Sequence, residues 1–146
     1  MSVTRGHSAP ALTKGILKLS RHIDPSSRPD YVVVEPGEDC LHDSCFDNVA
    51  AIVRRNGGSV QYGWRLRQEA LAYVEGRFHA VWRRHDGTLI DVTPRLDGIA
   101  EILFLPDSRT VWTGDPIEPR RVMLNEQPCY CGSNMPFKIC HGLSDD

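Results

Sequence analysis

Four side chains near the end of the chain have the types and spacing of a metal site. They are three cysteines and one histidine: Cys129, Cys131, Cys140 and His141. Thiolate and imidazole are preferred zinc ligands, and a Cys-x-Cys pair followed after eight residues by Cys-His can bring four ligands to one tetrahedral ion. Because four protein ligands leave no open position for water or substrate, the spacing predicts a structural zinc ion.

A second set of residues has the chemistry of a thiol active site, which needs a nucleophile, a base and a group that orients the base. The candidates are Cys45 as nucleophile, His79 as general base and acid, and Asp91 as the orienting carboxylate. Cys45 opens the segment "CFDNVAAIVRRN", whose apolar residues have helical spacing and which ends at Gly57-Gly58. A helix N-terminus favours a thiolate and offers N–H groups to an oxyanion. Asp43 and Ser44, just upstream, are candidates to cap it.

Whether His79 meets Asp91 depends on the turn in "RHDGT". A two-residue Asp86-Gly87 loop pairs residue 82 with 91 and puts His79 and Asp91 on opposite faces of the hairpin. A three-residue loop, with Gly87 in the left-handed conformation, pairs residue 81 with 91 and brings the two side chains to one face. The triad hypothesis therefore predicts the second register.

Other roles for these residues stay open from the sequence. Cys45 could be a small buried apolar residue, His79 a strand residue with a satisfied ring, and Asp91 a cap for the turn that follows it. Glu75 and Asn48 are secondary candidates, which could bridge helix and sheet or bind substrate. The segment "CLHDSC" also offers Cys40, His42 and Cys45 as half of a metal site, without an obvious complementary pair.

The remaining segments suggest one helix followed by an antiparallel sheet. Strand-like runs rich in β-branched and aromatic residues are "YVVVEPG", "SVQYGWRL", "LAYVEGRFHAVWRR", "TLIDVTP", "EILFLPD" and "RTVWTG". The segment "RQEALAYVEG" is also compatible with a short helix. Residues 1–30 are basic and rich in Ser and Pro, which predicts a flexible or loosely packed N-terminal arm. The proline-rich residues 115–128 predict a linker between a domain at 31–114 and a zinc element at 129–142.

The terminal segment "CYCGSNMPFKICHG" resembles the SEC-C motif, a small zinc-binding element that ends the preprotein-translocase motor ATPase and many bacterial proteins. The resemblance implies zinc binding by all four ligands named above, and docking of a protein partner by analogy with the translocase motor. The middle, "NMPFKI", replaces the usual lysine-rich residues, so the resemblance does not extend to a basic contact surface.

The upstream segment also carries a resemblance. A cysteine that opens a helix, a Gly-Gly after it, then Gly63-Trp64, "HAVW" and "DVTP", is similar to the core of the papain-like superfamily, especially its transglutaminase-like branch. The whole pattern resembles more narrowly a group of bacterial and phage proteins, many of which end in a SEC-C motif. The superfamily resemblance implies an α+β fold with a helix and an antiparallel sheet, the triad named above, and Trp64 or Trp82 as a wall of the cleft.

Composition sets the class of protein that we expect. The chain has 146 residues, 40% apolar and 25% charged residues and a net charge of -2, which predicts one globular domain with short appendages. It lacks a long apolar run and a secretory leader pattern, so we expect a cytoplasmic protein with no membrane partner. The dispersed positive charges of the arm lack interleaved aromatic residues, which argues against a nucleic-acid partner.

The expected function is thiol-dependent acyl transfer on a peptide or amide substrate, by hydrolysis, deamidation or transamidation, with zinc in a structural role. The alternative is a non-catalytic zinc-binding module that holds a protein partner.

Overall fold

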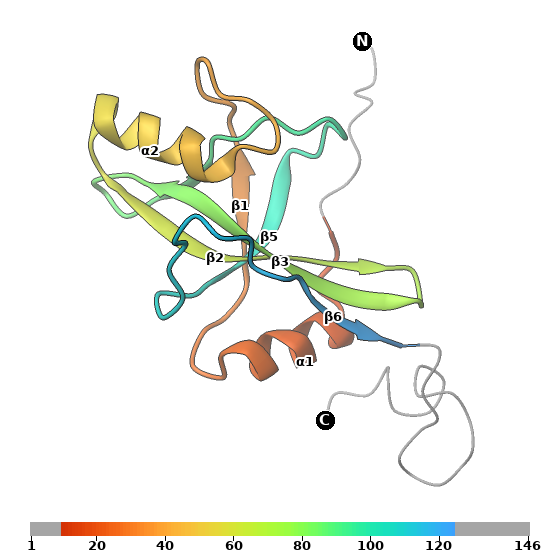
Figure 1. The fold of residues 1–146 in the computed structure, drawn as a ribbon. Helices are drawn as coiled ribbons and strands as arrows, with labels where there is room; N and C mark the ends of the chain where they lie inside the picture. Colours follow the sequence, from red (N-terminus) through yellow and green to blue (C-terminus); the bar gives the residue numbers. More distant parts are fainter. Residues whose placement is uncertain (1–9, 125–146) are drawn as a thin grey trace, which may run out of the picture.

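A computed structural model of the chain describes residues 10–124, which form two helices and six strands (Figure 1). In chain order the elements are α1 (Lys14–Ile23), β1 (Asp30–Val34), α2 (Cys45–Asn56), β2 (Ser59–Glu69), β3 (Tyr73–Arg83), β4 (Leu89–Asp91), β5 (Glu101–Pro106) and β6 (Arg120–Met123). No helix among these residues is long and apolar enough to cross a membrane.

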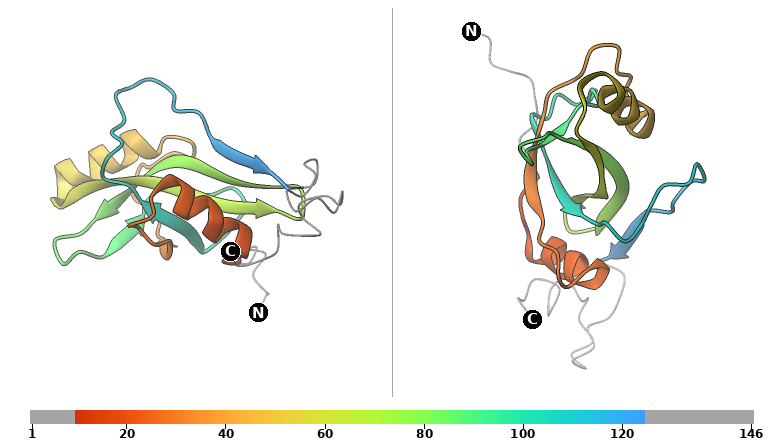
Figure 2. Two further views of the ribbon diagram at one scale, coloured as in Figure 1. Left: turned by 90° about the horizontal axis from the view of Figure 1, so that it is seen from below. Right: turned by 90° about the vertical axis from the view of Figure 1, so that its left-hand side faces the viewer.

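Five of the strands close into a mixed β-barrel. Their order is β2-β5-β1-β4-β3, β3 pairs again with β2, and β6 extends β3 outside the ring. The β1–β4 pair is parallel and the other pairs are antiparallel. The right-hand view of Figure 2 shows the curved sheet with α1 and α2 on opposite sides.

The expectation of a papain-like or transglutaminase-like helix on an antiparallel sheet is therefore wrong. The difference arises at β2, which pairs with β3 over its whole length while its residues 63–66 also pair with β5. With both edges of β2 occupied, the sheet curls and closes, which leaves no free edges in the ring. Strand partners this far apart in the chain leave no signal in the local alternation of apolar residues.

The closed sheet has an inner and an outer face, because successive side chains of a strand point to opposite faces. Outer residues pack under the helices. The cluster between α1 and the barrel is made up of Ile16, Leu19, Ile23, Trp64, Leu66, Val74, Leu103, Leu105 and Leu124. The cluster between α2 and the barrel is made up of Val49, Ile52, Ala80, Ile90 and Val92. Inside the barrel, Val32, Val81, Ile102 and Phe104 form a third apolar cluster.

Helix α1 lies within the segment that we expected to be a flexible or loosely packed arm. Its buried residues Ile16, Leu19 and Ile23 recur at helical spacing, and Thr13 caps it by accepting a hydrogen bond from the Ile16 N–H at 3.1 Å. The polar and basic residues on the opposite face of the helix made the average composition of the segment resemble that of a flexible tail. One narrow apolar face is nevertheless enough to pack the helix against the barrel.

Three local expectations have clear outcomes. The helix at Cys45–Asn56 is confirmed, and it ends as expected at Gly57, whose φ is 81° and whose N–H donates to the Val53 carbonyl. The helical alternative at "RQEALAYVEG" is wrong, because this segment contains the end of β2, the turn and the start of β3. The segment "RTVWTG" contains no strand, and β6 lies inside the expected linker.

Candidate functional site

The hairpin from β3 to β4 has the register that the triad hypothesis requires. Trp82 lies opposite Ile90, and the N–H of Arg84 donates to the Thr88 carbonyl at 2.9 Å, so the loop is the three residues 85–87. Gly87 adopts φ 91°, in the left-handed region that closes such a loop. The side chains of residues 79 and 91 therefore share the inner face of the barrel.

His79 and Asp91 meet on that face. His79 Nε2 lies 3.1 Å from Asp91 Oδ2, with His79 only 7% exposed and Asp91 0% exposed. The other oxygen, Asp91 Oδ1, accepts a hydrogen bond from the Thr93 N–H at 3.2 Å, which fixes the carboxylate. Because Nε2 faces Asp91, Nδ1 is the ring nitrogen that remains for a second partner.

The surroundings of His79 favour its protonated form. Burial, the largest single influence, lowers the pKa of the ring, but the Asp91 carboxylate and then the Cys45 side chain outweigh it and raise the pKa to about 9. Asp91 thus acts as a buried counter-ion that favours the protonated ring. Cys45 and His79 also line the same pocket.

Cys45 is the first residue of α2 and lines the same pocket as His79 and Asp91. Ser44 is the N-cap, but its side chain makes no capping hydrogen bond, contrary to the expectation that it would satisfy the first turn. The Ser44 side chain therefore leaves the N–H groups of the first turn available to another acceptor. All three residues of the predicted triad are thus brought together at one pocket.

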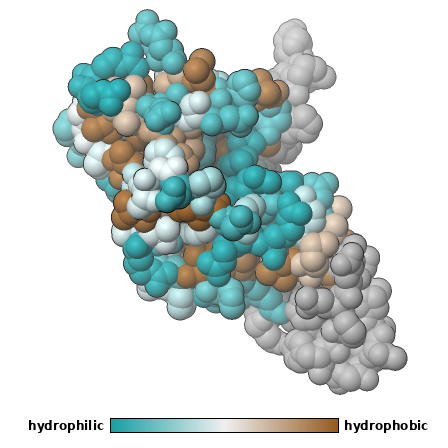
Figure 3. Space-filling model, viewed as in Figure 1, coloured by the Kyte–Doolittle hydropathy of each residue, from teal (hydrophilic) through white to brown (hydrophobic). Residues whose placement is uncertain are grey.

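The pocket has a volume of about 440 Å³ and combines charged and apolar walls. Its apolar side chains are Phe46, Phe78, Pro94, Leu96, Ile117 and Pro119. Trp64 and Trp82, which we expected at the cleft, instead donate indole hydrogen bonds to Asp107 and to the Gly57 carbonyl. On the face of the molecule drawn in Figure 3, hydrophilic residues predominate and apolar residues form separate patches.

Asn48 joins the helix to the end of β4. Its side-chain amide accepts from the Leu41 N–H at 3.0 Å and donates to the Leu41 carbonyl at 2.7 Å and to Thr93 Oγ1 at 3.0 Å. These bonds tie the loop before Cys45 and the segment after Asp91 to one buried side chain. Asn48 is therefore the bridge between helix and sheet that we considered, and it positions the thiol relative to the carboxylate.

Sequence reasoning missed the packing that supports the His79 ring. Gly63 is the cross-strand partner of His79, and a Cβ at Gly63 would lie 2.3 Å from the Leu105 carbonyl oxygen and 2.5 Å from the Phe104 ring. Phe104 occupies this space and packs edge-on to His79, with ring centroids 6.4 Å apart. The sequence shows Gly63 next to Trp64, but no local pattern indicates that Phe104 packs against Gly63 from another strand.

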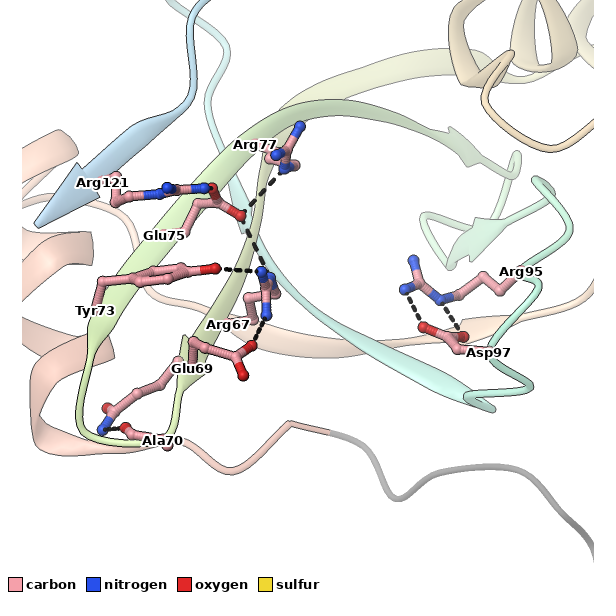
Figure 4. Close-up of polar contacts among 10 residues, drawn as sticks. Arg67, Glu69, Ala70, Tyr73, Glu75, Arg77, Arg95, Asp97 and Arg121 are labelled. Carbon is pink, nitrogen blue, oxygen red and sulfur yellow. Dashed lines mark hydrogen bonds and ion pairs between the residues drawn. The ribbon is translucent and has the colours of Figure 1, made fainter. Parts of the chain in front are cut away.

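Glu75, the other secondary candidate, does not face substrate. It is 0% exposed and lies at the centre of a cluster of Arg67, Arg77 and Arg121 (Figure 4). Arg77 belongs both to this cluster and to the wall of the pocket. Glu75 thus holds in place an arginine that faces the candidate site.

Within residues 10–124 no group of three or more His, Cys, Asp or Glu side chains is arranged to hold a metal ion. Cys40, His42 and Cys45 accordingly do not form the half-site that their spacing suggested. The four predicted zinc ligands, Cys129, Cys131, Cys140 and His141, lie outside the residues that the structure describes.

Comparison with known proteins identifies one part of the chain. A family model described as the SEC-C motif matches residues 127–143. The chain carries a SEC-C motif. No curated protein and no solved structure matches the chain, and nothing supports a papain-like domain upstream of the motif. SEC-C is typically a zinc-binding motif, and the matched residues include all four predicted ligands.

Proposed function

We propose that the barrel is a thiol-dependent acyl-transfer enzyme that acts on a peptide or amide bond. The Cys45 sulfur attacks the carbonyl carbon, the leaving amine takes a proton from His79 Nδ1, and the first-turn N–H groups of α2 stabilise the oxyanion. A water or an amine then attacks the thioester and returns its proton to His79. Asp91 keeps the ring oriented and stabilises its charge.

One observation supports this proposal above the others: a buried His79–Asp91 pair at 3.1 Å lines the same pocket as a cysteine at a helix N-terminus. This chemistry does not require a papain-like fold, because a nucleophile, base and orienting group recur in this arrangement on unrelated folds. A purely structural histidine would need a hydrogen-bond partner, but it would need neither an adjacent thiol nor a pocket.

Iodoacetamide alkylation of the zinc-loaded chain tests the proposal. Cysteine reacts as the thiolate, and an adjacent imidazolium stabilises that form. At pH 6 we expect Cys45 to be alkylated at least about tenfold faster than Cys40, whose thiol has a pKa raised mainly by burial. The rates would be measured by mass spectrometry of peptides after timed labelling.

Two variants make this test specific to the dyad. In His79→Gln the rate at Cys45 should fall to that of Cys40, whereas in His85→Gln, a change to an exposed histidine of the same hairpin, it should not change. A Cys45 thiol that stays inert up to pH 9, or that reacts equally fast without His79, would exclude the mechanism.

We further propose that Cys129, Cys131, Cys140 and His141 bind one structural zinc ion. The SEC-C match and the donor set of three sulfurs and one imidazole support this assignment. A bound zinc ion would organise a segment with too few apolar residues to build a core of its own.

Elemental analysis should find about one zinc per chain in the purified protein, and near none after Cys129→Ser, because a three-ligand site holds zinc far more weakly. The matched control is Cys40→Ser, which removes a thiol outside the motif and should leave the zinc content unchanged. Full zinc content in Cys129→Ser would refute the assignment of that ligand.

A non-catalytic binding module is the second candidate, and the SEC-C motif is the observation that favours it, because such a motif is compatible with partner docking and requires no chemistry in the barrel. The alkylation experiment separates the two candidates. An unreactive Cys45 in a fully zinc-loaded chain would favour the binding module.

A further inference from the structure

Charged side chains of both signs line the pocket beside Cys45. Three arginines line it: Arg65, Arg77 and Arg95. Of its three lining aspartates, Asp43 is exposed, Asp91 pairs with His79 at 3.1 Å, and Asp97 pairs with Arg95 at 2.6 and 3.0 Å. The latter pair is drawn apart from the Glu75 cluster in Figure 4.

Arg65 and Arg77 are neighbours on the inner face of the barrel. They are cross-strand partners in the β2–β3 register, and the next pair on that face is Gly63 with His79. Gly63 has no side chain, and the Phe104 ring occupies the space beside it. The two guanidinium groups therefore belong to the same inner face as the catalytic ring.

The two arginines differ in how they are held. Arg77 Nε donates to Glu75 Oε1 at 3.1 Å, which directs the side chain through one edge of its guanidinium. Arg65 Nε is buried and has no hydrogen-bond partner. Leaving a buried donor unpaired destabilises a protein unless another group satisfies the donor. The structure thus leaves a charged donor without an acceptor in the wall of the pocket.

We propose that Arg65, supported by Arg77, binds a carboxylate of the substrate, so that the scissile amide belongs to an acidic peptide or to one with a nearby free C-terminus. A planar guanidinium can donate two parallel hydrogen bonds to the two oxygens of a carboxylate. This inference rests on the proposed thiol chemistry at Cys45 and adds to it the class of substrate. Leu96, 83% exposed at the rim, offers an apolar contact to the remainder of the peptide.

Iodoacetate and iodoacetamide test this proposal because they deliver the same alkyl group with and without a carboxylate. We expect the iodoacetate-to-iodoacetamide rate ratio at Cys45 to exceed that at Cys40 at least about tenfold, since a partly buried cation attracts the anionic reagent. In Arg65→Met the excess should be largely lost, although His79 still contributes, and Arg65→Lys should recover part of it. Arg54→Met, at an exposed position of α2, is the control and should keep the wild-type ratio.

Peptide protection identifies the source of the carboxylate. A capped tripeptide with a free C-terminus and an amidated tripeptide with a glutamate side chain would each be tested for slowing iodoacetamide at Cys45. Protection by either supports the proposal and names the source, whereas protection by neither overturns it. The alkylation rates separate failure of this proposal from failure of the thiol chemistry. If Cys45 reacts with iodoacetamide but has the same iodoacetate-to-iodoacetamide rate ratio as Cys40, only the carboxylate proposal fails. If Cys45 does not react with iodoacetamide at all, the thiol chemistry itself fails. The wild-type ratio needs no variant, so a misfolded Arg65→Met chain does not block the test.

Discussion

Raising the pH from 6 to 10 should lower the free energy of unfolding by about 3 kcal/mol through the deprotonation of His79. The pKa of His79 is about 9 in the folded state against 6.5 as the reference, and each pKa unit corresponds to about 1.4 kcal/mol. Below pH 6.5 the ring is protonated in both states, so the full stabilisation is present. It is lost as the pH rises through about 9, because the folded state must then release the proton that it bound more tightly.

Urea unfolding at a series of pH values would measure this effect. In His79→Gln the dependence between pH 6.5 and 9 should disappear, apart from the background of other groups, and Asp91→Asn should abolish it because the counter-ion of the ring is gone. His85→Gln should keep the wild-type slope, since His85 is exposed in the turn. Identical slopes in wild type and His79→Gln would contradict a charged His79 in the folded state.

Replacing Glu75 with Gln should cost about 2 kcal/mol at pH 7, less than the 3–5 kcal/mol typical of a broken buried ion pair, because its arginine partners are partly hydrated. The carboxylate is 0% exposed, and the side chains of Arg67, Arg77 and Arg121 are 39%, 51% and 43% exposed. Burial, the largest influence, raises the pKa of Glu75, but hydrogen bonds and charges from Arg121 and Arg77 outweigh it and lower the pKa. This contribution to stability is therefore present above the unfolded pKa and is lost as the pH falls through the folded one.

The Glu75 cluster also attaches β6, because Arg121 belongs to that strand and its Nε donates to Glu75 Oε2 at 3.0 Å. Amide hydrogen exchange in β6 should accelerate in Glu75→Gln more than exchange in β1, which the cluster does not touch. The control is Glu69→Gln, at an exposed carboxylate that pairs with Arg67, where we expect a change within about 0.5 kcal/mol. Unchanged exchange in β6 would show that its pairing with β3 suffices without the ion pair.

Local signals in the sequence were reliable where a short segment determines its own structure. The α2 boundaries followed from apolar spacing and a Gly-Gly stop. The sequence left two turn registers open at this hairpin, and the structure has the three-residue loop that the triad hypothesis predicted. The terminal ligands were recognisable because a motif that folds around one ion keeps its spacing within a few residues.

The sequence by itself therefore determined the SEC-C motif, the helix that begins at Cys45 and the residues of the candidate triad. Only the tertiary structure decided that the sheet closes into a barrel, that α1 docks on it, and that Arg65 and Arg77 share its inner face with His79. These features depend on strand partners far apart in the chain, such as Gly63 with Pro106 or Val34 with Asp91. Side-chain periodicity specifies which face a residue occupies, but it carries no information on which distant strand lies beside it.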